Sequence, residues 1–173
     1  FPALFFMLCV SSIVACVVLP PKDLAEFGKT LAATALFVSN FKFLSGAGYF
    51  AGVSELKPLL HTWSLAVEEQ FYIFFPLLLA VVYRRFRSFA TWLFATLLVL
   101  SLAASEWASS RYPTFNFYFT GTRAFELLIG AILAMKALPP ISRKVTRESL
   151  SALGLLLIAG SLFMFGKNTP FPG

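Results

Sequence analysis

Long apolar runs separated by short polar segments dominate this sequence. Of its 173 residues, 58% are hydrophobic and 13% are charged, whereas soluble domains average about 25% charged residues. A helix of about 20 apolar residues crosses a bilayer and satisfies its own backbone there. We therefore expect an all-α, polytopic transmembrane helix bundle, with Pro58 in the first turn of its longest span. Five expected spans cover residues 3–19, 58–83, 89–108, 117–138 and 149–165.

Residues 24–44 form a less uniform apolar segment, because Lys29, Asn40 and Lys42 interrupt it. An apolar stripe broken by polar residues is typical of a helix that lies in the membrane interface. We therefore predict one interfacial or weakly inserted helix here, in addition to the five spans. Residues 109–116 are predicted to form a short polar loop.

Basic residues give the expected orientation. Segments 84–87 and 136–147 hold seven of the 14 Lys and Arg residues in 16 positions. Loops on the cytoplasmic side of a membrane are rich in these residues, and two expected spans separate the segments, so both should face the cytoplasm. The net charge of +6 is thus a topology signal, and no basic patch in a polar, aromatic context indicates nucleic-acid binding.

Cys9 and Cys16 lie in the first apolar run. A helix holds residues seven apart at a separation of about 10 Å, which is too far for a disulfide. We expect both to be small buried hydrophobic residues. The single histidine and the absence of metal-ligand spacing predict no protein-built metal site.

The most apolar run opens with polar and ionisable groups, in the stretch His61-Thr-Trp-Ser-Leu-Ala-Val-Glu-Glu-Gln-Phe-Tyr72. Helical spacing places His61, Ser64, Glu68 and Tyr72 on one face. Ionisable groups inside a span are costly and by default mark a functional site. The alternative is that these groups lie at the water interface and only snorkel.

Charges on three expected spans should lie at a similar depth. A helix rises about 1.5 Å per residue, which places Glu68, Glu69, Arg123 and Glu126 in the outer half of the bilayer, with Glu106 near the outer end of its span. Arg123 and Glu126 are three residues apart and can pair, and such a pair alone could serve only helix packing. The whole cluster favours acid–base chemistry, or a proton or ion relay in a transporter.

Two stretches resemble motifs of the acyltransferase 3 family, the bacterial membrane O-acyltransferases that acetylate lipopolysaccharide and peptidoglycan sugars. The stretch from His61 to Tyr72 resembles the family signature, and Tyr118-Phe-Thr-Gly-Thr-Arg-Ala-Phe-Glu-Leu-Leu-Ile-Gly130 resembles its later Arg-x-x-Glu-Leu-x-x-Gly helix. Thr169-Pro-Phe-Pro-Gly173 resembles the loop before a further helix in members with a C-terminal SGNH-hydrolase-like domain. We therefore expect residues 1–173 to be a partial acyltransferase 3 transmembrane domain, an interior fragment of a longer chain.

The resemblance implies a reaction and a set of site residues. Such enzymes take an acyl group from a cytoplasmic donor, usually acetyl-CoA, and deliver it to a sugar hydroxyl outside. O-acylation needs a base for the hydroxyl proton and a donor for the oxyanion. The family's essential Arg-x-x-x-His motif is absent here, so the base is expected upstream and the fragment alone should be inactive. The expected catalytic residues are Glu68, Arg123 and Glu126, and the expected substrate-binding residues are His61, Trp63, Ser64, Glu69 and Tyr72.

The expected function is therefore that of a multi-pass acyltransferase of the bacterial cytoplasmic membrane. Its partners would be the lipid bilayer and a cell-envelope polysaccharide or glycolipid that accepts an acyl group, an acetyl group by the resemblance. The alternative is part of a transporter or flippase whose buried charges relay protons. Internal repeats would favour a transporter, and the sequence shows none. A purely structural scaffold does not explain the charge cluster.

Overall fold

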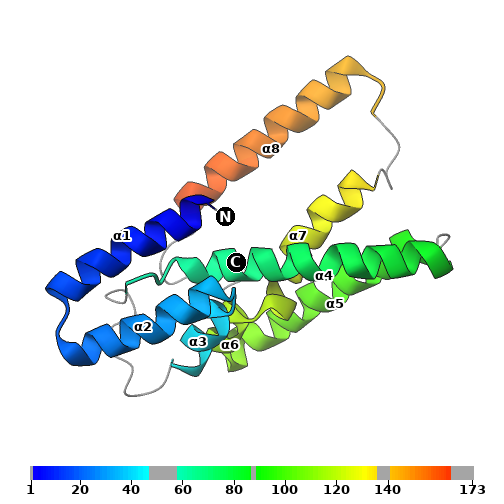
Figure 1. Cartoon of the computed structure of the whole chain (residues 1–173). Coiled ribbons are helices and arrows are strands. Elements are labelled where there is room, and N and C mark those ends of the chain that lie inside the picture. The colour runs from blue at the N-terminus through cyan, green and yellow to red at the C-terminus, as the bar shows by residue number, and fades with distance from the viewer. Residues whose placement is uncertain (1, 47–57, 87–88, 136–140, 165–173) are drawn as a thin grey trace. The chain divides into compact units, whose positions relative to one another are not determined.

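The computed structural model describes residues 2–46, 58–86, 89–135 and 141–164, and these are all-α (Figure 1). The chain divides into two compact units. Unit 1 consists of Phe1–Val81 with Phe117–Gly121, and unit 2 of Val82–Asn116 with Thr122–Gly173. The helices are α1 (Pro2–Val18), α2 (Pro21–Ala35), α3 (Ser39–Ser45), α4 (Thr62–Phe86), α5 (Ala90–Arg111), α6 (Pro113–Tyr118), α7 (Thr120–Ala134) and α8 (Lys144–Met164).

Three of these helices, α4, α5 and α8, are long and apolar enough to cross a membrane. They coincide with three of the five predicted spans, so the all-α class is confirmed, with three helices long and apolar enough to span a membrane. Helix α1 matches the first predicted run but has 17 residues, and α7 has 15. Because both are short for a span of about 20 residues, the count of five spans stays a prediction.

The prediction of one helix over residues 24–44 is wrong. The segment forms α2 and α3, and the chain between them passes through Phe37 with φ of 54°. A bulky residue in this left-handed region cannot continue a right-handed helix. Pro21 stands in the first turn of α2, where the missing amide hydrogen costs nothing.

The predictions for residues 109–138 also need correction. Helix α5 continues to Arg111 and α6 begins at Pro113, so most of the predicted polar loop is helical. The helix predicted over 117–138 is broken at Phe119, between α6 and α7. Pro113 explains the first break, because proline cannot continue α5 but fits the first position of α6. Residues 136–138 lie outside the described part of the chain.

Several basic residues predicted in loops belong to helices. Arg84 and Arg85 lie in the last turn of α4, where positive charge stabilises the negative end of the helix dipole. Helix α8 starts at Lys144 rather than at residue 149, and Lys144 lies 3.8 Å from Glu148 one turn later. The end of α4 and the start of α8 therefore extend past their apolar runs into charged residues.

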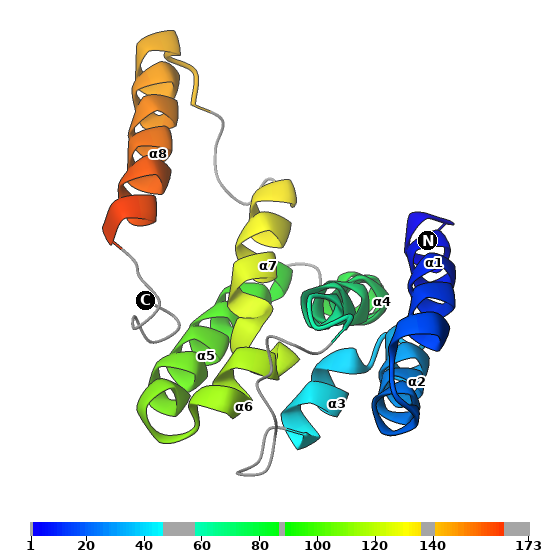
Figure 2. The ribbon, with the colours of Figure 1, turned by 90° about the vertical axis from the view of Figure 1, so that its left-hand side faces the viewer.

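In unit 1, α1 and α2 lie side by side, as both views show (Figures 1 and 2). Their shared core contains Leu8, Ala15, Phe27 and Leu59. The buried stripe of α1 runs through Leu8 and Ala15, so the cysteines, each one position later, point elsewhere. Both cysteines are free, as the spacing predicted, but the expectation that they are buried is wrong, because both are exposed.

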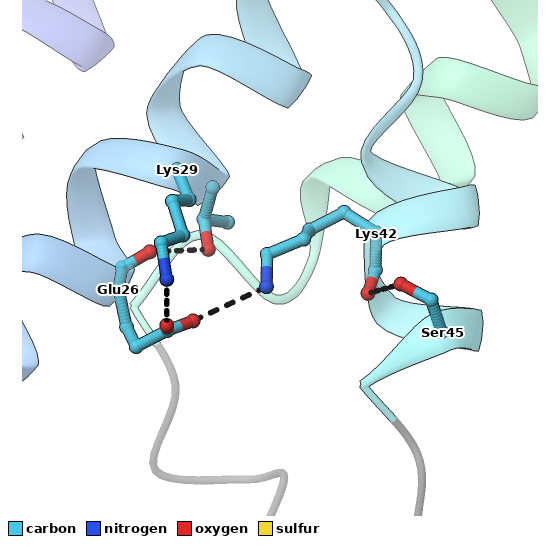
Figure 3. A network of polar contacts seen from close by, with 5 residues as sticks. Glu26, Lys29, Lys42 and Ser45 are labelled. Carbon is cyan, nitrogen blue, oxygen red and sulfur yellow. Dashed lines mark hydrogen bonds and ion pairs between the residues drawn. The ribbon is translucent and has the colours of Figure 1, made fainter.

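An ion network connects α2 to α3 (Figure 3). Glu26 of α2 accepts from Lys29 Nζ at 2.6 Å and from Lys42 Nζ of α3 at 3.1 Å. These hydrogen bonds, together with the positive charges, hold the pKa of the Glu26 carboxyl below its ordinary value. The two lysines that interrupt the apolar pattern therefore share one carboxylate partner.

In unit 2, buried polar groups connect α5 to α6 and α7. Ser105 Oγ donates to Asn116 Oδ1 at 3.1 Å, and Asn116 Nδ2 donates to the Ser105 carbonyl at 2.9 Å. Thr122 Oγ1 donates to the Asn116 carbonyl, and the Phe125 amide donates to Ser101 Oγ. Because every partner lies inside the protein, these contacts fix the α5–α6 corner.

Candidate active site

A tight turn precedes α4. Leu59 is buried with φ of 64°, and its carbonyl accepts from both the amide and the hydroxyl of Thr62. Ser39 Oγ donates to the Thr62 carbonyl, and Thr34 Oγ1 lies 2.9 Å from Thr62 Oγ1. The prediction that Pro58 starts the helix is therefore wrong, since the left-handed Leu59 delays the helix to Thr62.

This turn changes the position of His61. The histidine stands just before α4 and is exposed, and its carbonyl accepts from Ser64 Oγ at 3.1 Å. Ser64, Glu68 and Tyr72 follow at helical spacing on α4; Glu68 and Tyr72 are exposed and Ser64 is half-buried. The predicted face thus contains three residues in helical register, and His61 lies outside that register.

A polar cluster that the sequence analysis did not single out lies beside the carboxylate pair of α4. We call Asn40, Gln70 and Thr120 the polar clamp. Gln70 Nε2 donates to Asn40 Oδ1 at 2.9 Å and to the Phe37 carbonyl at 2.8 Å, and Gln70 Oε1 accepts from Thr120 Oγ1. Asn40 Nδ2, fully buried, donates to the Tyr118 carbonyl and to Thr120 Oγ1.

The polar clamp holds two irregular backbone segments of unit 1, at Phe37 and at residues 118–120, against α4. Every donor and acceptor of the two amides has a partner, which is the condition under which buried polar networks stabilise a unique arrangement. The signal in the sequence was an amide inside the apolar run of α4 and another inside the segment 24–44. Its meaning depended on partners 30 and 80 residues away in the chain.

Trp63, predicted to bind substrate, packs within unit 1. Its ring lies 4.5 Å from that of Phe117 and 5.5 Å from that of Tyr118, the latter edge to face. Edge-to-face aromatic pairs of this kind stabilise cores. These contacts give Trp63 a packing role, and its stacking on a sugar stays a prediction.

The predicted pair of Arg123 and Glu126 forms on α7, in unit 2. Arg123 Nη1 lies 3.4 Å from Glu126 Oε1, and the side chains are 13% and 45% exposed. The carboxylate is thus open to a further partner, whereas the guanidinium is largely covered. The similar depth predicted for the charges of three helices involves both units and stays a prediction.

A pocket in unit 1 brings two predicted substrate-binding residues together. It has a volume of about 420 Å³ and is lined by Ala3, Leu4 and Met7 of α1 and by His61, Thr62, Leu65 and Glu69 at the start of α4. Glu69, and not Glu68, therefore shares a cavity with His61. Among the described residues, no group of three or more His, Cys, Asp or Glu could hold a metal ion.

Comparison with known proteins identifies the family of the chain. Residues 1–170 match the acyltransferase 3 family model, described as an acyltransferase domain. An uncharacterized protein of Haemophilus influenzae is 32% identical over the whole chain, which covers 75% of it. The O-acetyltransferase OatA of Staphylococcus aureus is 29% identical over 92% of the chain. YrhL of Bacillus subtilis, provisionally named a peptidoglycan O-acetyltransferase, is 38% identical over 98%.

The chain spans 27% of the length of OatA and 29% of that of YrhL. No solved structure matches it. The resemblance seen in the His61–Tyr72 and Tyr118–Gly130 stretches is confirmed by the match over nearly the whole sequence. The chain belongs to the acyltransferase 3 family.

Proposed function

We propose that this chain is part of a membrane enzyme that transfers an acetyl group from cytoplasmic acetyl-CoA to a hydroxyl of a cell-envelope sugar on the outer side. The family match over residues 1–170 carries the proposal. The names of OatA and YrhL support acetyl transfer to oxygen, and that of YrhL supports peptidoglycan as acceptor. Neither name supports lipopolysaccharide, which the resemblance had included.

The membrane placement of the proposed enzyme rests on α4, α5 and α8. We propose that the basic segments 84–87 and 136–147 face the cytoplasm, as the bias of Lys and Arg toward cytoplasmic loops predicts. The start of α4 then faces outward, toward the acceptor. The lipid bilayer is the first partner of the chain, and further domains, such as the SGNH-like domain that the resemblance includes, belong to the proposed whole protein.

The proposed catalytic groups are Glu68, Arg123 and Glu126. Glu68 is exposed on α4 and its side chain bonds to no described residue, so it is available to orient a base supplied by another part of the protein. A histidine held by a carboxylate is the usual general base. Arg123 offers a fixed positive charge for an oxyanion or a phosphate, with Glu126 as its partner.

Substitution of Glu68 in the whole protein tests the function. Glu68→Gln should lower sugar acetylation by about 10²–10⁴-fold, the usual contribution of acid–base groups, with unchanged amounts of inserted protein. The measurement is transfer of radiolabelled acetyl from acetyl-CoA to envelope glycan in membranes. Tyr83→Phe, on the same helix, is the control. Wild-type transfer by Glu68→Gln would remove Glu68 from the chemistry, and no transfer by the wild type would overturn the proposed function.

A further inference from the structure

The pocket between α1 and the start of α4 is larger than the group that the proposed reaction transfers. Its volume of about 420 Å³ falls within the range of about 300–1,000 Å³ that is usual for small-molecule sites. An acetyl group has the bulk of a few water molecules, each about 30 Å³. An acetyl group alone would leave most of the pocket empty, so the pocket fits a larger ligand.

The pocket is lined by four apolar and three polar residues of the described ranges. The apolar residues are Ala3, Leu4 and Met7 on one turn of α1, with Leu65 of α4. Methionine adapts its shape to irregular apolar ligands. A wall of this kind favours a hydrocarbon chain over a wholly polar ligand.

The polar residues that line the pocket are His61, Thr62 and Glu69, and the hydroxyl of Thr62 is already bonded to the Leu59 carbonyl. The side chains of His61 and Glu69 make no hydrogen bond or ion pair with the part of the chain that the structure describes. A carboxylate only accepts hydrogen bonds, and a hydroxyl can both donate to it and pair with an imidazole. No Lys or Arg is among the described residues that line the pocket. An anionic head group would therefore lie near the Glu69 carboxylate with no lysine or arginine from these residues to balance its charge.

We propose that this pocket binds a hydroxyl-bearing amphiphile, with different hydroxyl groups of its head toward His61 and Glu69 and its hydrocarbon chain along α1. The class includes alkyl glycosides and uncharged glycolipids. The inference rests on the proposed function only where it takes the bound hydroxyl as the acyl acceptor. Binding itself requires no acyl transfer and is measured separately.

Photo-crosslinking of the full-length protein in phosphatidylcholine nanodiscs tests the site. The probe is dodecyl glucoside with a diazirine in its alkyl chain, and labelled peptides are identified by mass spectrometry. We expect label on Leu4, Met7 and Leu65, competed by unmodified dodecyl glucoside. Met7→Trp, which fills the pocket, should lower this label at least about tenfold. Phe6→Trp puts the same ring on the same helix at a position that does not line the pocket and is 72% exposed, and should leave the label unchanged.

The polar lining residues are tested by a second variant and a second competitor. Glu69→Leu should weaken competition by dodecyl glucoside about tenfold, because a hydrogen bond to an ionised acceptor is lost. Dodecyl phosphate, with the same chain and an anionic head, should compete poorly with the wild type. If Met7→Trp does not fold, Leu4→Phe fills part of the same space.

Three results would overturn the inference. The first is an equal amount of label in Met7→Trp and Phe6→Trp. The second is competition by dodecyl phosphate as strong as that by dodecyl glucoside. The third is a wild-type full-length protein in which no label reaches Leu4 or Met7. Binding of the glucoside by a wild-type protein without acetyl transfer would support the pocket and overturn the proposed function. Acetyl transfer by a protein that does not bind the glucoside would support the proposed function and overturn the pocket.

Discussion

Gln70 and Glu68 lie two positions apart on α4 and have different environments. Gln70 of the polar clamp uses its whole amide to bond Phe37, Asn40 and Thr120. Glu68, two positions earlier, is exposed, and its side chain bonds to no residue in the described ranges. An uncharged amide is far cheaper to bury than a carboxylate, provided that its bonds are satisfied. The hydrogen-bonded amides therefore hold the helices in place, whereas the Glu68 carboxylate points away from these contacts.

The largest expected effect comes from replacing the clamp amide. Gln70→Leu would remove the Gln70 hydrogen bonds to the buried Asn40 and to the half-buried Phe37 and Thr120, and a buried polar group that loses its partner costs about 1–3 kcal/mol. We expect a loss of about 3–5 kcal/mol in the free energy of unfolding of the full-length protein. The measurement is an unfolding titration with sodium dodecyl sulfate in detergent micelles, followed by circular dichroism.

Glu68→Leu is the matched control for Gln70→Leu, because it places the same residue on the same helix. An exposed position should change stability by about 0.5 kcal/mol or less, while acetyl transfer is lost. Equal stability of the two variants would contradict the comparison and would leave the polar clamp without a structural role.

The next largest effect should come from the corresponding amide of unit 2. Asn116→Leu removes both hydrogen bonds to Ser105 and should cost about 2 kcal/mol in the same unfolding titration. Thr114 is exposed on the same short helix, and the control variant Thr114→Val should unfold like the wild type. If Asn116→Leu unfolded like this control, the α5–α6 corner would depend on Pro113 and apolar packing alone.

The smallest effect concerns the ion network of Glu26. Because Lys29 and Lys42 lower the pKa of this carboxyl in the folded state, its contribution to stability is complete above the ordinary pKa of glutamate, about 4.3. The contribution is lost as the pH falls through the lowered folded value. The stability difference between wild type and Glu26→Gln, measured by the same titration from pH 7 downward, should shrink to zero in acid. A difference that persists there would show that the charge of Glu26 is not its cause.

The sequence by itself determined the helical class, the apolar runs of α1, α4, α5 and α8, and the family. Apolar runs and a contiguous signature are local properties, and the bilayer allows few other folds for them. The Arg123–Glu126 pair was also predictable, since residues three apart on a helix must be neighbours. The assignment of Glu68, Arg123 and Glu126 to catalysis remains a proposal.

Only the tertiary structure decided where the helices break and which polar groups meet. Phe37, Leu59 and Phe119 are bulky apolar residues, a type that does not itself signal a turn. A hydrogen bond from Gln70 holds the left-handed backbone at Phe37, and packing in the core of α1 and α2 holds it at Leu59. The break at Leu59 takes His61 out of helical register and places it in a pocket with Glu69. The partners of Gln70 lie on segments far away in the chain. Contacts of this kind have no period in the sequence, because they depend on how separate helices pack.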